Sequence, residues 1–152
     1  MFSRRQVDVG GVLVGADAPV AVQSMTNTRT SDVPATLAQI RALTTAGAVL
    51  VRCAVPDEES ARAFRALVDE SPVPLIADVH FDYRLAVAAL GAGAAGVRIN
   101  PGNIGGEERV RAVVAAAADT GAVIRVGVNS GSLQRDLRDL EARDPAGALV
   151  ES

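Results

Sequence analysis

Short apolar runs recur in this sequence at nearly regular intervals. Each run is followed by a segment in which apolar residues have the spacing of a helix. The runs begin near residues 20, 48, 73, 95 and 122. They lie about 25 residues apart, the length of one strand and one helix with their turns. Most residues in these runs are apolar, and apolar and polar residues do not alternate cleanly. This is expected of strands whose two faces are both covered. Right-handed crossovers between such strands predict a parallel sheet, so the fold class is α/β.

The remaining elements follow from apolar spacing and from the positions of Gly and Pro. Apolar residues alternate around Gly10 and Gly11, which predicts a hairpin over residues 7–14. Elsewhere the sequence predicts strands over 20–25, 48–55, 73–79, 95–99 and 122–128, helices over 33–46, 57–69, 82–90, 107–120 and 133–143, and loops over 100–106 and 129–132.

Two architectures accommodate these units. One is a complete doubly wound domain with five strands. The other is the first part of a TIM-like (β/α)8 barrel, which normally needs about 250 residues. Residues 147–152 have the pattern of the middle of an amphipathic helix without a cap, which favours the incomplete barrel. We therefore expect residues 1–152 to form one partial TIM-barrel domain, with an N-terminal hairpin and about five βα units.

Composition narrows the possible functions. The net charge is −3, which argues against broad nucleic-acid binding. The chain has no apolar run of about 18 residues, so we expect no membrane span. No apolar segment follows the first charged residues, so we expect no leader peptide and a cytoplasmic location. Cys53 is the single cysteine, which excludes a disulfide framework and a metal cluster held by this chain's own thiolates.

Arginine recurs near the ends of three apolar runs. Arg52, Arg98 and Arg125 are all preceded by apolar strand residues. A guanidinium in such a place is costly to bury without a partner. The carboxyl ends of parallel strands meet at one edge, so the three groups point to one shared phosphate or carboxylate. The alternative is pairing with an internal acid, for which Asp78 is available.

Two predicted loops follow these arginines. Asn100 begins the loop 100–106 and Asn129 the loop 129–132, and each loop leads from a strand into a helix. Free backbone N–H groups at such junctions can hold a phosphate. The alternative is two ordinary capped turns.

Residues 91–96 match the motif G-x-G-x-x-G of dinucleotide-binding sites. They follow a helix and lead into a strand, whereas that motif must follow a strand and open a helix, so we expect no dinucleotide site here.

Other polar residues gather at two strand ends. Asp78 and His80 share one face at the end of a predicted strand, and Asp82 is expected to cap the next helix. We expect Asp78 and His80 to orient a substrate or relay protons; a metal site with Asp82 is the alternative. Gln23 and Ser24 belong to a polar segment with more hydrogen-bonding groups than a connector needs, although backbone capping alone is the alternative.

Four segments together resemble one enzyme family. Residues 21–28, 77–84, 97–105 and 125–133 are similar, in the same order, to segments of the 4-hydroxy-3-methylbut-2-enyl diphosphate synthases. These are iron–sulfur oxidoreductases of non-mevalonate isoprenoid biosynthesis. The resemblance covers essentially the whole chain.

The resemblance implies a function for the site residues. The family's barrel binds 2-C-methyl-D-erythritol 2,4-cyclodiphosphate and the enzyme reduces it to 4-hydroxy-3-methylbut-2-enyl diphosphate. The substrate-binding positions it implies here are Arg52, Arg98 and Arg125, with Asn100 and Asn129 beside them. Ferredoxin or flavodoxin supplies the electrons. A [4Fe–4S] cluster lies on a separate domain, which closes over the barrel of the partner in a homodimer.

The chain departs from the family in length. We expect it to end after five of the βα units, without the iron–sulfur domain, and to bind no cluster itself. The isolated chain is therefore expected to be inactive, since charges and hydrogen bonds bind a substrate but supply no electrons. Two alternatives remain: a non-catalytic anion-binding βα module, or a fragment of another phosphate-binding barrel such as a dihydropteroate synthase-like enzyme.

Overall fold

The computed structural model describes residues 4–127 and 137–151. A two-stranded antiparallel hairpin comes first, formed by β1 (Gln6–Val9) and β2 (Val12–Gly15), as predicted. A five-stranded parallel sheet follows, in the spatial order β3-β4-β5-β6-β7. Its strands are β3 (Gln23–Met25), β4 (Leu50–Ala54), β5 (Leu75–Asp78), β6 (Gly96–Ile99) and β7 (Val123–Val126).

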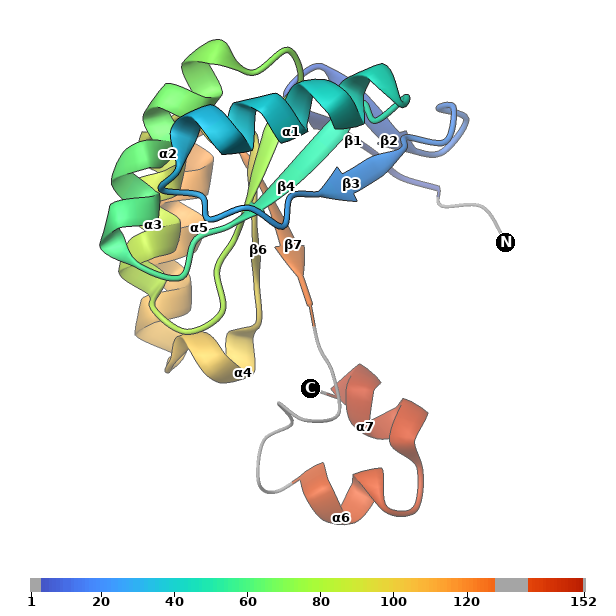
Figure 1. The fold of residues 1–152 in the computed structure, drawn as a ribbon. Coiled ribbons are helices and arrows are strands. Elements are labelled where there is room, and N and C mark those ends of the chain that lie inside the picture. The colour runs from blue at the N-terminus through green and yellow to red at the C-terminus, as the bar shows by residue number, and fades with distance from the viewer. Residues whose placement is uncertain (1–3, 128–136, 152) are drawn as a thin grey trace.

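The order of the strands distinguishes the two predicted architectures. Spatial order equals chain order from β3 to β7, and α1 (Val33–Thr45), α2 (Glu58–Glu70), α3 (Tyr83–Gly91) and α5 (Glu107–Thr120) lie on one side of the sheet (Figure 1). A doubly wound sheet reverses its strand order and carries helices on both faces. The structure is therefore the barrel type of α/β fold, and that prediction is confirmed.

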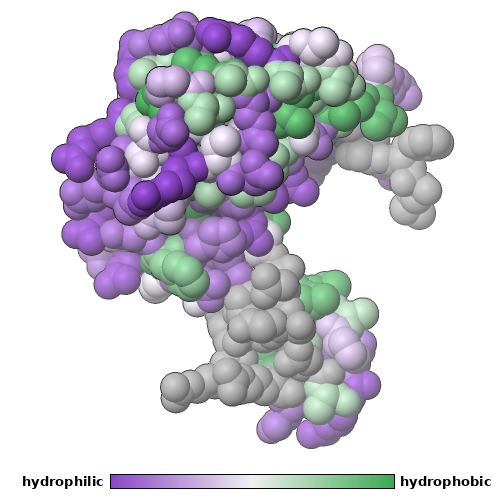
Figure 2. Space-filling view, viewed as in Figure 1, coloured by the Kyte–Doolittle hydropathy of each residue, from purple (hydrophilic) through white to green (hydrophobic). Residues whose placement is uncertain are grey.

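The core lies between the sheet and these helices. Successive strand residues point to opposite faces, so Val51 and Cys53 of β4 face the helices, and Phe64 and Leu67 of α2 pack in the same cluster. The outer surfaces of the helices are mostly hydrophilic in Figure 2, whereas hydrophobic surface gathers near the hairpin. No helix within the described ranges has the length and apolar character needed to cross a bilayer.

We call the opposite face of the sheet, turned away from the helices, the inner face. Its part near the amino ends of the strands is apolar: Leu50 and Ile76 pack there against Val9 of the hairpin. The next inner-facing residues along the strands are polar, and they include Arg52 and Asp78. The hairpin thus covers the amino-terminal end of the inner face and leaves its carboxyl end for a site.

Three element predictions need correction. Strand β3 is shorter than predicted, because Val20 is 93% exposed and forms no part of the ladder. The predicted loop 100–106 contains a short helix, α4 (Pro101–Ile104), because Asn100 caps it and Pro101 occupies its first turn. The predicted helix 133–143 is described only in part, as α6 (Arg138–Glu141), and the helical ending is confirmed as α7 (Pro145–Glu151).

Asp82 caps α3 as predicted. Its Oδ1 accepts a hydrogen bond from the backbone N–H of Arg84 at 2.9 Å, and the Arg84 Nη2 lies 2.7 Å from its Oδ2. Hydrogen bonds from Arg84 lower the pKa of Asp82 below its ordinary value. The guanidinium has the larger effect and the backbone N–H the smaller one. The carboxylate therefore stabilises the start of α3 while it stays ionised.

We predict that Asp82→Ala lowers the free energy of unfolding by about 1 kcal/mol or less, because the pair is exposed and water screens it. Asp82→Asn keeps a capping oxygen and should lose less. Because the pKa of Asp82 is lowered in the folded state, its contribution is present above the unfolded pKa of about 3.9 and disappears as pH falls through the folded pKa. Urea unfolding at neutral and acidic pH measures both effects; equal losses for Ala and Asn at neutral pH would contradict the capping role.

Candidate anion-binding site

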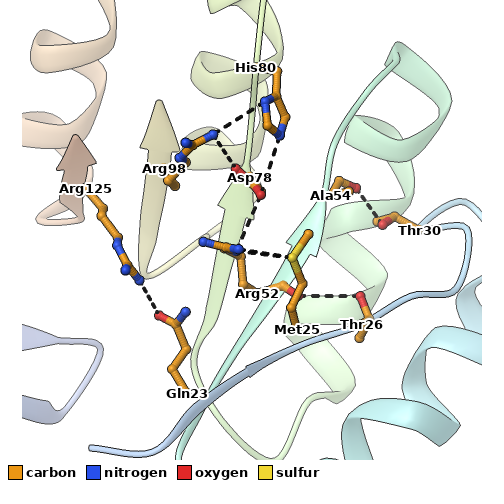
Figure 3. Close-up of polar contacts among 10 residues, drawn as sticks. All are labelled: Gln23, Met25, Thr26, Thr30, Arg52, Ala54, Asp78, His80, Arg98 and Arg125. Atoms are coloured by element: carbon orange, nitrogen blue, oxygen red, sulfur yellow. Dashed lines mark hydrogen bonds and ion pairs between the residues drawn. The ribbon is translucent and has the colours of Figure 1, made fainter. Parts of the chain in front are cut away.

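A buried carboxylate lies at the centre of the polar part of the inner face. Asp78, at the end of β5, is 4% exposed. Its Oδ2 lies 3.4 Å from the Arg52 Nε, and its Oδ1 lies 3.5 Å from the Arg98 Nη1 (Figure 3). His80 joins this group, with its Nε2 3.6 Å from the Asp78 Oδ2 and its Nδ1 3.4 Å from the Arg98 Nη1. One acid therefore serves two guanidinium groups and an imidazole.

Arg125 has a different partner. It is the register neighbour of Arg98 on the adjacent strand, so both side chains start on the inner face. The Arg125 Nη1 donates to the Gln23 Oε1 at 3.3 Å, and no acid within the described ranges pairs with it. Internal ion pairing thus accounts for Arg52 and Arg98 together, through one shared carboxylate, and leaves Arg125 out. Three guanidinium charges face one carboxylate, so the cluster keeps a net positive charge of two.

Two residues that the sequence analysis did not single out shape this cluster. The Met25 Sδ accepts hydrogen bonds from the Arg52 Nε at 3.3 Å and Nη2 at 3.2 Å. Gly127, just after β7, donates its N–H to the Ile99 carbonyl at 2.8 Å. A Cβ on Gly127 would lie 2.7 Å from the Arg98 Cζ, so a larger residue would displace that guanidinium. The two-residue step from Arg125 to Gly127 is the sequence signal that could have placed Gly127 on the inner face.

Hydrogen bonds to β4 hold the segment after β3 in place. The Thr26 N–H donates to the Arg52 carbonyl at 3.0 Å, and the Thr30 hydroxyl donates to the Ala54 carbonyl at 2.6 Å. Both threonines are buried. Ser24 lies between the inner-facing Gln23 and Met25 and pairs in register with Val51, which faces the helices. The structure therefore brings Gln23 to the arginines and places Ser24 on the other face.

Asn100 has a structural partner of its own. It is buried, and its Oδ1 accepts from the Gly102 N–H at 3.1 Å. Its carbonyl accepts from the N–H groups of Asn103 and Ile104, each at 3.0 Å. The prediction of free backbone donors is therefore wrong for residues 102–104, because α4 uses them itself. Asn129 and the loop 129–132 lie outside the described residues.

Cys53 lies away from the cluster. It is 0% exposed and packs among the residues between sheet and helices. Burial raises the pKa of its thiol, an effect that a hydrogen bond with Thr26 partly offsets. Within the described part of the chain, no three His, Cys, Asp or Glu side chains are placed to hold a metal ion.

The sequence matches the model of the GcpE TIM-barrel domain family over residues 4–152. The chain belongs to this family. Curated relatives named 4-hydroxy-3-methylbut-2-en-1-yl diphosphate synthase (flavodoxin) include those of Magnetococcus marinus, 58% identical over 97% of this chain, and Desulfotalea psychrophila, 56% identical over 99%. The chain spans 40% and 42% of the length of these two relatives.

Solved structures show the same fold in another family. The dihydropteroate synthase of Yersinia pestis matches 98% of this chain and 57% of its own, with a TM-score of 0.61 and 18% identity. The dihydropteroate synthase of Xanthomonas albilineans matches 94% of this chain and 56% of its own, with a TM-score of 0.62 and 23% identity. At these identities the likeness shows the barrel fold alone. The alternative of a dihydropteroate synthase-like activity therefore receives no support from it.

The burial of Cys53 predicts an unreactive thiol. Because only the thiolate attacks a disulfide reagent, a raised pKa and a closed core both slow the reaction. We expect a colorimetric disulfide reagent to label Cys53 at the rate of local or global opening in the native chain, and rapidly in concentrated urea. Equal rates in both conditions would contradict this placement of the thiol.

Proposed function

We propose that this chain provides the first part of the substrate-binding barrel of a 4-hydroxy-3-methylbut-2-en-1-yl diphosphate synthase. Its inner face binds the diphosphate of 2-C-methyl-D-erythritol 2,4-cyclodiphosphate. Family membership and the names of the curated relatives support this assignment. The observation that carries the binding role is the gathering of three guanidinium groups and one carboxylate on the inner face: Arg52 and Arg98 share Asp78, Arg125 contacts Gln23, and the net charge is plus two.

The cluster suits a cyclic diphosphate in charge and in shape. Such a ring has an ionised oxygen on each phosphorus, and planar guanidinium groups donate paired hydrogen bonds to phosphate oxygens. Arg125 is exposed and its partner is a neutral amide, so its charge is available to a ligand. Arg52 and Arg98 keep further N–H groups beyond those that face Asp78.

Asp78 and His80 have complementary roles in this proposal. The Asp78 carboxylate orients Arg52 and Arg98, and it also lies 3.6 Å from the His80 Nε2. His80 is half exposed, so its ring can exchange a proton with a ligand or with solvent. Asn100 and Asn129 remain predicted substrate contacts, whereas Ser24 lies on the face of the sheet turned away from the cluster.

The [4Fe–4S] cluster that the family resemblance implies does not fit the residues of this chain. Cys53 is the single cysteine, and it is buried on the helix side of β4. We therefore derive no step through a cluster. In the whole enzyme, we propose that a separate domain of a homodimer holds it, and that flavodoxin, named for the relatives, or ferredoxin supplies electrons in the cytoplasm.

Arg125→Ala should weaken binding of the cyclodiphosphate to the purified chain by about tenfold to a hundredfold, as expected for a lost charge-assisted hydrogen bond. Isothermal titration calorimetry measures the affinity. Arg111→Ala is the matched control, since Arg111 pairs with Glu107 on the outer side of α5 and is 76% exposed. Equal losses in the two variants, or no binding by the parent chain, would overturn the proposal.

The purified chain should bind the cyclodiphosphate without reducing it. With dithionite as the reductant, we expect no 4-hydroxy-3-methylbut-2-enyl diphosphate, because Cys53 alone cannot hold a cluster. Mass spectrometry of the reaction mixture checks this, with a cluster-loaded full-length relative as the positive control. Product from the chain itself would disprove the division between binding and redox chemistry, whereas binding without product also fits the alternative of a non-catalytic anion-binding module.

A further inference from the structure

Strand β3 supplies two uncharged acceptors to the arginine cluster. The Gln23 Oε1 accepts from Arg125, and the Met25 Sδ accepts from Arg52 (Figure 3). Gln23 and Met25 are two residues apart on one strand, so both project onto the inner face. Neither side chain carries a charge, so neither cancels the charge of the guanidinium that it contacts.

The contact between Gln23 and Arg125 crosses the inner face. The two residues are 102 positions apart in the sequence, and they belong to β3 and β7, the two edge strands of the sheet. Three strands lie between them. The Arg125 side chain therefore extends across the inner face toward β3.

This contact gives Arg125 a different acceptor from its like-charged neighbour Arg98. Arg98 and Arg125 are register neighbours on adjacent strands, where guanidinium groups repel each other. Asp78 on β5 draws Arg98 to one side at 3.5 Å, and Gln23 on β3 draws Arg125 across at 3.3 Å. The two neighbouring guanidinium groups thus have separate acceptors, and neither acceptor is shared between them.

We propose that Gln23 and Met25 are positioning residues, which hold Arg125 and Arg52 in place for a bound diphosphate without neutralising them. The identity of the ligand in this inference rests on the proposed function. The positioning itself rests only on the geometry of the free chain. It replaces the predicted role of Gln23 as a direct substrate contact: Gln23 acts through Arg125.

A double-mutant cycle tests this assignment. We expect Gln23→Ala to weaken cyclodiphosphate binding about two- to tenfold, the effect of one neutral hydrogen bond. In an Arg125→Ala background the same change should have no effect, because the group that Gln23 positions is gone. Met25→Leu keeps the volume of the side chain and removes the sulfur. It should likewise weaken binding in the parent chain and have no effect in an Arg52→Ala background. Equal losses in both backgrounds would show direct contact with the ligand and overturn the proposal.

A readout without ligand separates this inference from the proposed function. In the free chain, NMR signals of the arginine Nε–H groups should change for Arg125 in Gln23→Ala and for Arg52 in Met25→Leu, with the other arginine unaffected. Unchanged signals would overturn the positioning role. If these shifts occur but the parent chain binds no cyclodiphosphate, the proposed function fails and the positioning stands; inorganic pyrophosphate then serves as the anion for the same cycle.

Discussion

The buried carboxylate of Asp78 is the interaction on which the rest of the site depends. A lone carboxylate with 4% exposure would be unstable as an anion, so it requires the two guanidinium groups beside it. The requirement is mutual, because Arg52 and Arg98 start on strands that flank β5 and would otherwise face each other across it as like charges. One acid cannot balance three arginines, so the inner face keeps an excess of positive charge, which attracts anions.

The barrel order of the strands gives this cluster its place. Alternation sends every second residue of each strand to the inner face, where the residues nearest the amino ends of the strands form a first layer. The first layer, with Leu50 and Ile76, is apolar and packs against the hairpin. The polar layer follows toward the carboxyl ends of the strands, where barrel enzymes carry their sites. The same strands therefore provide a sealed core at one end and an open charged surface at the other.

Much of this could be predicted from the sequence, and the exceptions have physical reasons. The meeting of Arg52, Arg98 and Arg125 on one face follows from the alternation of side chains along each strand and from the regular spacing of the βα units, both of which can be read from the sequence. The acceptor for Arg125 was not predictable, because it lies 102 residues away and depends on how strongly the sheet curves. Helix α4 was missed because its glycine content is typical of a loop, although Asn100 and Pro101 form a helix start.

Different strands carry different kinds of polar group on the inner face. Strands β4, β6 and β7 carry the cationic groups, β5 carries the anion that orients two of them, and β3 carries neutral acceptors. These side chains are fixed by a rigid sheet, so this part of the barrel has its positive charge without a redox group. An iron–sulfur cluster has a different requirement, a set of accessible thiolates, and the single buried Cys53 cannot meet it. The proposed function therefore assigns binding to the inner face and reduction to a different part of the enzyme.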